Sequence, residues 1–152
     1  DLGTGDPRVY FQRGLASFNL LNFQKSILDF TKSIEIDSTI PESYLNRGLA
    51  KFNLQDYRGA VLDFSELINL NSEFAPGYFY RGFAKSNLED YRGSILDFSK
   101  AIEYNPNYAD AYYQRGLSKY FLNQIEDCCL DLSKAGELGH EKAYEAIKNI
   151  CN

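Results

Sequence analysis

An arginine–glycine pair recurs four times in this chain at a constant interval of 34 residues. The flanking residues align as well, because a tyrosine precedes each glycine by four residues and a small residue follows it by twelve. The segments ILDF, VLDF, ILDF and CLDL come directly after these small residues. A fixed period of about 20–50 residues is the signature of a repeat architecture. The spacing therefore predicts an array of similar units.

Within each period the apolar residues follow the spacing of two helices with a short break between them. In the second period, Tyr44, Leu45 and Leu49 are in phase with one helix, and Val61 and Phe64 with the next. Prolines stand near the starts of the first two periods, where the first turn of a helix tolerates them. The sequence predicts four helical hairpins, over 7–40, 41–74, 75–108 and 109–142.

The two ends of the chain fall outside these hairpins. Residues 1–6, DLGTGD, are expected to be a disordered segment or the remnant of a tag. Residues 143–152 carry Ala143, Ile147 and Ile150 at helical spacing, with charged residues between them. Because a terminal repeat exposes an apolar face that its missing neighbour would bury, we expect this segment to be a capping helix.

The repeated pattern resembles the tetratricopeptide repeat (TPR). One copy, YRGFAKSNLEDYRGSILDFSKAIEYNP over 80–106, matches the TPR pattern almost throughout. The resemblance covers residues 7–142 and implies an all-α fold, a right-handed α-solenoid of antiparallel helical hairpins. It also implies a protein-interaction scaffold whose first helices line a concave groove for a peptide or protein segment.

Each repeated arginine is followed 16 residues later by an aspartate. In an antiparallel hairpin these two positions have similar heights, so we expect ion pairs between the two helices. The predicted pairs are Arg13–Asp29, Arg47–Asp63, Arg81–Asp97 and Arg115–Asp131. The alternative is that the arginines form a phosphate-binding rail along the surface.

The glycine beside each arginine costs helix stability, so its repetition indicates a packing role. We expect Phe30, Phe64 and Phe98 of the second helices to pack over the first three of these glycines. The structural glycines are Gly14, Gly48, Gly82 and Gly116.

The TPR resemblance places the candidate ligand-binding residues on the first helix of each hairpin. The asparagines at a 34-residue interval could bind an extended peptide backbone or cap their own helices. Aromatic residues could form a shelf for a ligand side chain. The candidate groove residues are Phe11, Asn19, Asn46, Asn53, Phe79, Tyr80, Asn87, Tyr113 and Gln114. Of the positions with which some TPR domains clamp a chaperone tail, only Asn46 matches, so such a tail is not expected. The acidic chain and the aromatic groove favour an apolar or basic peptide segment.

The composition argues against several other functions. The net charge of −5 disfavours nucleic-acid binding, and no apolar run is long enough for a membrane span. His140 is the only histidine and is expected in a solvent-exposed turn, and no residue set predicts catalysis, a metal site or a cofactor. We therefore expect a non-enzymatic, monomeric module, with self-assembly through the uncapped N-terminal hairpin as the alternative.

Cys128, Cys129 and Cys151 are the three cysteines of the chain. An odd number with two adjacent residues is not a disulfide framework, so we expect cysteines that act as small buried apolar residues. This usage favours a reducing compartment such as the cytoplasm.

Overall fold

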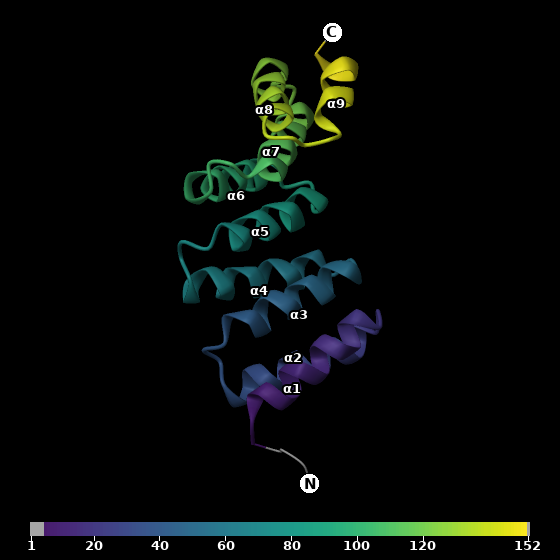
Figure 1. Ribbon diagram of the computed structural model, residues 1–152, viewed down its shortest axis with the longest axis vertical. Helices are drawn as coiled ribbons and strands as arrows, with labels where there is room; N and C mark the ends of the chain where they lie inside the picture. The colour runs from purple at the N-terminus through teal and green to yellow at the C-terminus, as the bar shows by residue number, and fades with distance from the viewer. Residues whose placement is uncertain (1–4, 152) are drawn as a thin grey trace. The chain divides into compact units, whose positions relative to one another are not determined.

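A computed structural model describes residues 5–151, and within this range all regular structure is helical (Figure 1). The helices are α1 (Pro7–Asn19), α2 (Phe23–Ile36), α3 (Pro41–Asn53), α4 (Tyr57–Leu70), α5 (Ala75–Asn87), α6 (Tyr91–Tyr104), α7 (Ala109–Phe121), α8 (Ile125–Glu137) and α9 (Ala143–Ile150). The predicted all-α fold of helical hairpins is confirmed. Of the segment expected to be disordered or a tag, residues 1–4 lie outside the described residues.

The hairpins are grouped into two compact units, an N-terminal unit over residues 1–72 and a C-terminal unit over residues 73–152. In the N-terminal unit, α1 packs on α2, α2 on α3, and α3 on α4. In the C-terminal unit, α5 packs on α6, α6 on α7, α7 on α8, and α8 on α9. The repeat period alone predicted one continuous array, so the boundary between the second and third hairpins is a finding of the structure.

Each hairpin turns where a residue enters the left-handed backbone region. Gln55, in the turn after α3, has a φ of 62°. The N–H of Gln55 donates to the Phe52 carbonyl and the N–H of Asp56 to the Lys51 carbonyl, each at 2.9 Å. Asp56 then caps α4 by accepting a hydrogen bond from the N–H of Gly59, also at 2.9 Å. The equivalent left-handed residues are Leu21, Glu89 and Asn123. This turn chemistry ends one helix and starts the next within a few residues.

The core of each of the first three hairpins is a phenylalanine ring from the second helix that packs on a glycine of the first. Phe30, Phe64 and Phe98 are fully buried. A Cβ atom added to Gly48 would lie 2.7 Å from the Phe64 ring, which is closer than side chains tolerate. The fourth hairpin has a smaller residue, and a Cβ atom on Gly116 would lie 3.3 Å from the Leu132 side chain. Glycine is therefore required most strictly where the facing residue is phenylalanine.

The residue just before each buried aspartate of the second helices is an exposed leucine. Leu28, Leu62, Leu96 and Leu130 are 68–70% exposed. Consecutive residues of a helix point in directions about 100° apart, so the segment LDF turns its leucine to solvent while it buries the next two side chains. These leucines form a matched set of exposed apolar positions away from the first helices.

Helix α9 covers α8 and is joined to it covalently. Cys129 of α8 and Cys151, the C-cap of α9, form a disulfide, whereas Cys128 is buried and free. The Tyr144 hydroxyl also donates to the Gly136 carbonyl at 3.3 Å. The expectation that the cysteines serve only as buried apolar residues is correct for Cys128 and wrong for the other two. It failed because the turn after α8 brings two cysteines together that are 22 residues apart in the sequence.

The first prediction concerns the repeated glycines. We expect Gly48→Ala to lower the free energy of unfolding by about 1–2 kcal/mol, because overpacking against Phe64 outweighs the gain in helix propensity. Gly116→Ala should cost less, because the nearest atoms of Leu132, Asp131 and Cys128 lie 3.3 Å from the added Cβ atom instead of 2.7 Å. Urea unfolding followed by circular dichroism measures both. Equal losses at the two positions would contradict the packing role of Phe64.

The second prediction concerns the thiols. Burial raises the pKa of the Cys128 thiol, which keeps it protonated and unreactive at neutral pH. We expect iodoacetamide to label no cysteine in the folded oxidised chain, one after unfolding without reductant, and three after unfolding with reductant. Mass spectrometry of the intact chain counts the labels. Three labels without reductant would show that Cys129 and Cys151 are not bonded.

Candidate peptide-binding surface

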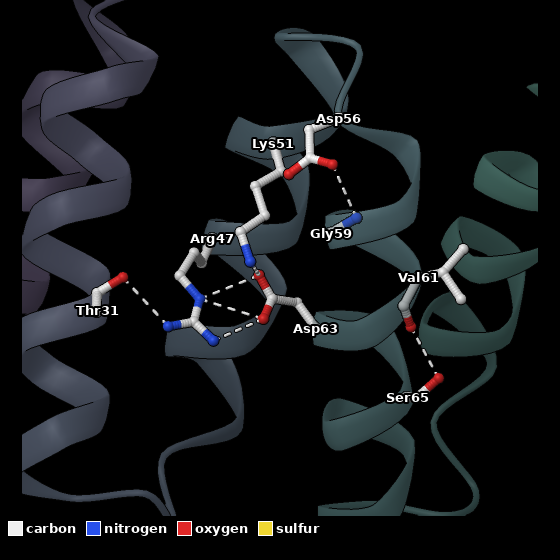
Figure 2. A network of polar contacts seen from close by, with 8 residues as sticks. All are labelled: Thr31, Arg47, Lys51, Asp56, Gly59, Val61, Asp63 and Ser65. Atoms are coloured by element: carbon white, nitrogen blue, oxygen red, sulfur yellow. Dashed lines mark hydrogen bonds and ion pairs between the residues drawn. The ribbon is translucent and has the colours of Figure 1, made fainter.

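Asp63 lies at the centre of a buried ionic network in the N-terminal unit (Figure 2). Its side chain is 3% exposed, and its Oδ1 atom lies 2.6 Å from Nη2 of Arg47. The Nζ atom of Lys51 lies 2.8 Å from the other carboxylate oxygen. A carboxylate is stable at such depth only when cations and hydrogen bonds replace the water it has lost. Arg47 and Lys51 of α3 replace this water for the single carboxylate of Asp63 on α4.

Arg47 also connects its hairpin to the preceding one. Its Nη1 atom donates to the Thr31 hydroxyl of α2 at 3.1 Å, on the side of the guanidinium away from Asp63 (Figure 2). The guanidinium carbon lies 5.6 Å from the centre of the Tyr44 ring, within the range of a cation–π contact. The guanidinium therefore lies among a carboxylate, a hydroxyl and a ring of the protein itself.

The C-terminal unit repeats this network twice. The distances from arginine Nη2 to aspartate Oδ1 are 2.7 Å for Arg81–Asp97 and 2.6 Å for Arg115–Asp131. Lys85 and Lys119 each lie 2.8 Å from the second carboxylate oxygen of these aspartates. Arg115 donates further to the Ser99 hydroxyl of the preceding hairpin at 3.0 Å.

The first hairpin has a simpler version of the network. Arg13 lies 2.6 Å from Asp29, but Ser17 takes the place of the lysine. The side chain of Arg13 is 57% exposed, against 16% for Arg47. No helix of the described residues precedes α1 to cover this arginine as α2 covers Arg47.

The lysines of the network were not identified from the sequence, although a signal for them exists. Lys51, Lys85 and Lys119 each follow the repeated arginine by four residues. Residues four apart lie on one face of a helix, so each lysine reaches the aspartate that already pairs with the arginine.

The candidate asparagines end helices or bond within them. Asn53 and Asn87 are the last residues of α3 and α5, and their side-chain amides donate to the carbonyls of Leu49 and Phe83 at 2.8 Å. Asn46 donates to the Glu42 carbonyl at 2.8 Å in the same way. Asn19 is exposed at the end of α1. A ligand that approached these bonded amides would find their oxygen atoms and one remaining N–H donor of each available.

The candidate aromatic residues of α5 form a cluster that is half-buried. Phe79 lies 5.4 Å from Tyr80, 6.2 Å from Phe83 and 4.8 Å from Tyr108, measured between ring centres. Burial raises the pKa of the Tyr108 phenol. In the N-terminal unit, Phe11 similarly lies 5.7 Å from the core ring of Phe30. Part of each ring therefore serves packing, and the exposed part remains available to a ligand.

Tyr113 stacks on His140, which comes from the turn between α8 and α9. The ring centres lie 4.0 Å apart and the planes differ by 16°. The His140 side chain is only 15% exposed, and its Nε2 atom lies 3.4 Å from a carboxylate oxygen of Asp110. The expectation of a solvent-exposed histidine was therefore wrong. The stack on Tyr113 buries the imidazole ring of His140. At the corresponding point of the third hairpin, Tyr108 stacks on Phe79 in the same way.

The candidate residues are divided between the two units. Phe11, Asn19, Asn46 and Asn53 belong to the N-terminal unit, and Phe79, Tyr80, Asn87, Tyr113 and Gln114 to the C-terminal unit. The structure brings Tyr113 and Gln114 together at one surface pocket of about 350 Å³, beside Asp110 and the 139–142 turn.

Residues 5–151 contain neither a metal-binding cluster nor a membrane-spanning helix. Within that range, no cluster of three or more histidine, cysteine, aspartate or glutamate residues could hold a metal ion. None of the helices described there is both long enough and apolar enough to cross a membrane.

Comparison with known families matches the tetratricopeptide repeat over residues 7–40 and 41–74, and a TPR repeat over residues 87–122. Among curated proteins, no sequence matched.

Several solved structures share the fold of this chain. A crystal structure of MamA has 21% identity and a TM-score of 0.86, over 92% of this chain and 82% of that chain. MamA 41-end from Desulfovibrio magneticus RS-1 has 19% identity and a TM-score of 0.85, over 98% and 96% of the two chains. The first TPR of Spaghetti (RPAP3), bound to the HSP90 peptide SRMEEVD, has 23% identity and a TM-score of 0.75, over 80% and 96%.

The third prediction concerns the ionic network. We expect Asp63→Asn to lower the free energy of unfolding by about 2–3 kcal/mol, because Arg47 and Lys51 then face each other without a counter-charge. Asp29→Asn is the matched control and should cost less, because a single, mostly exposed arginine loses its partner there. Urea unfolding measures both variants. A loss at Asp29 equal to that at Asp63 would contradict the role of the paired cations.

Proposed function

Because the chain belongs to the tetratricopeptide repeat family, we propose that it is a non-catalytic scaffold that binds a peptide or protein segment on its first helices. The observation that carries this proposal is the contrast between the two helices of a hairpin. The second helices bury the aspartates and aromatic rings that hold the fold together. The first helices present half-buried aromatic rings and amides, which suit contact with a ligand.

The C-terminal unit is the stronger candidate for the binding surface. Tyr80 on α5 and Tyr113 on α7 are both half-buried, and Tyr113 with Gln114 lines the surface pocket at the 139–142 turn. Amphipathic aromatic side chains of this kind dominate the energetics of protein interfaces. The first TPR of Spaghetti provides a precedent, since that fold is solved with a peptide bound.

A chaperone tail is not the ligand that this surface favours. The candidate residues retain only Asn46 of the clamp positions, and its amide is already bonded to Glu42. The net charge of −5 also opposes a peptide that ends in several carboxylates.

Self-association through the N-terminal hairpin is the second candidate. Val9 of α1 is 44% exposed, whereas Ser43 and Ala111, at the same position of the second and fourth hairpins, are fully buried. Ser43 is covered by α2, where its hydroxyl lies 3.0 Å from that of Ser33. Among residues 5–151 no helix covers the corresponding face of α1, so this face would accept a helix from a second copy.

The fourth prediction tests the proposed surface by affinity capture and quantitative mass spectrometry. We expect Tyr80→Ala/Tyr113→Ala to recover specific partners about tenfold less than the original chain, because two hot-spot rings are lost. Leu96→Ala/Leu130→Ala is the matched control, since it truncates two exposed apolar residues of the same unit and should leave recovery unchanged.

The reverse result, with partners lost only in the leucine variant, would place binding on the second helices and contradict the proposal. Circular dichroism establishes that each variant is folded. Sedimentation of the chain at two concentrations shows whether it associates with itself instead.

A further inference from the structure

Two adjoining surface pockets lie along the side of α7 that carries Tyr113. The first, of about 350 Å³, is bounded by Asp110, Gln114 and Glu141. The second, of about 270 Å³, is bounded by Leu117, Glu145 and Ile150. Tyr113 and Lys142 line both pockets and so form their common wall. Together they make one continuous surface, which we call the α7–α9 surface.

The rim of the α7–α9 surface carries an excess of negative charge. Asp110, Glu141 and Glu145 are all exposed, and Lys142 is the one cationic side chain that lines the two pockets. Among the described residues, Glu141 and Glu145 have no ion-pair partner, and Asp110 has only the His140 contact at 3.4 Å. In contrast, the carboxylates of the repeated network are each paired with one or two cations at 2.6–2.8 Å. The rim therefore keeps a net negative charge, with three carboxylates against the single Lys142.

The floor between these carboxylates is formed by the rings of Tyr113 and His140 and becomes apolar beyond them. His140 stacks against the Tyr113 ring, and Leu117 and Ile150 line the pocket beyond it. A side chain that fits both parts needs a long apolar stem and a cationic head. Lysine and arginine have this form.

The wall formed by α9 is held in place before any ligand binds. The Cys129–Cys151 disulfide ties its C-terminal end to α8, and the Tyr144 hydroxyl ties its first turn to the Gly136 carbonyl. Ala143, the first residue of α9, is fully buried. A wall that is already ordered lowers the entropic cost of binding.

We propose that the α7–α9 surface binds a basic peptide segment, with one lysine or arginine stem over Tyr113 and its charged head among Asp110, Glu141 and Glu145. This inference rests on the proposed function and specifies the chemistry of the partner. It also excludes acidic tails from this surface, because their carboxylates would meet three others.

The test uses the full oxidised chain and four pools of immobilised heptapeptides. The central residue of each pool is lysine, arginine, leucine or glutamate, and the flanking residues are degenerate. We expect the lysine and arginine pools to bind about fivefold more chain than the leucine pool, and the glutamate pool to bind least. Raising the salt from about 50 to 300 mM should reduce this preference, because exposed charges are screened.

A matched pair of variants separates local charge from net charge. Glu141→Gln/Glu145→Gln should lower binding to the lysine and arginine pools about fivefold, as expected for two exposed charge pairs. Glu89→Gln/Glu126→Gln removes the same charge elsewhere in the C-terminal unit and should leave binding unchanged.

Two outcomes overturn the inference. If the lysine and arginine pools bind no better than the leucine pool while Tyr113→Ala still abolishes binding, the proposed function stands and the basic partner is wrong. If no pool binds above background, the basic-segment inference fails, and affinity capture with Tyr80→Ala/Tyr113→Ala decides the proposed function separately.

Discussion

The buried aspartate of each hairpin is the constraint on which the rest of the structure depends. A carboxylate buried beside the core is tolerable only if cations meet it, and in the last three hairpins two cations come from the opposite helix at positions four residues apart. Because Asp63 accepts from both Arg47 and Lys51, the height of α4 against α3 is determined by charge as well as by packing. The glycine beside the arginine lets the two helices approach closely enough for these contacts.

Much of this arrangement could be predicted from residue spacing. The 34-residue period indicates the family and the hairpins, because local helical spacing depends little on distant contacts. The pairing of Arg47 with Asp63 follows from the equal heights of residues in an antiparallel hairpin, although the role of Lys51 was not predicted. The division into two units was not predictable, since the period continues through residue 73 without a break.

The end of the fourth hairpin was the least predictable region, because the period itself changes there. The buried Ala143 follows the buried Ala111 by 32 residues, two short of the repeat. This shorter connection places His140 over Tyr113 and Cys151 beside Cys129. An alignment of the repeats at an interval of 34 residues does not predict either contact. The candidate binding surface of the C-terminal unit thus combines a repeated part, on α7, with a part that occurs once, from the turn and α9.

The geometry of the arginine contacts also bears on how such a chain can grow by duplication. Arg47 reaches 16 residues forward to Asp63 and 16 residues back to Thr31, and Arg115 does the same with Asp131 and Ser99. An exchange between genes that adds or removes one whole period preserves both spacings, wherever within the period the crossover falls. The arginine at every new boundary between repeats then keeps both its aspartate and the serine or threonine hydroxyl of the preceding hairpin, without further mutation. A chain built in this way can change its number of hairpins in one genetic event and still pair its buried charges.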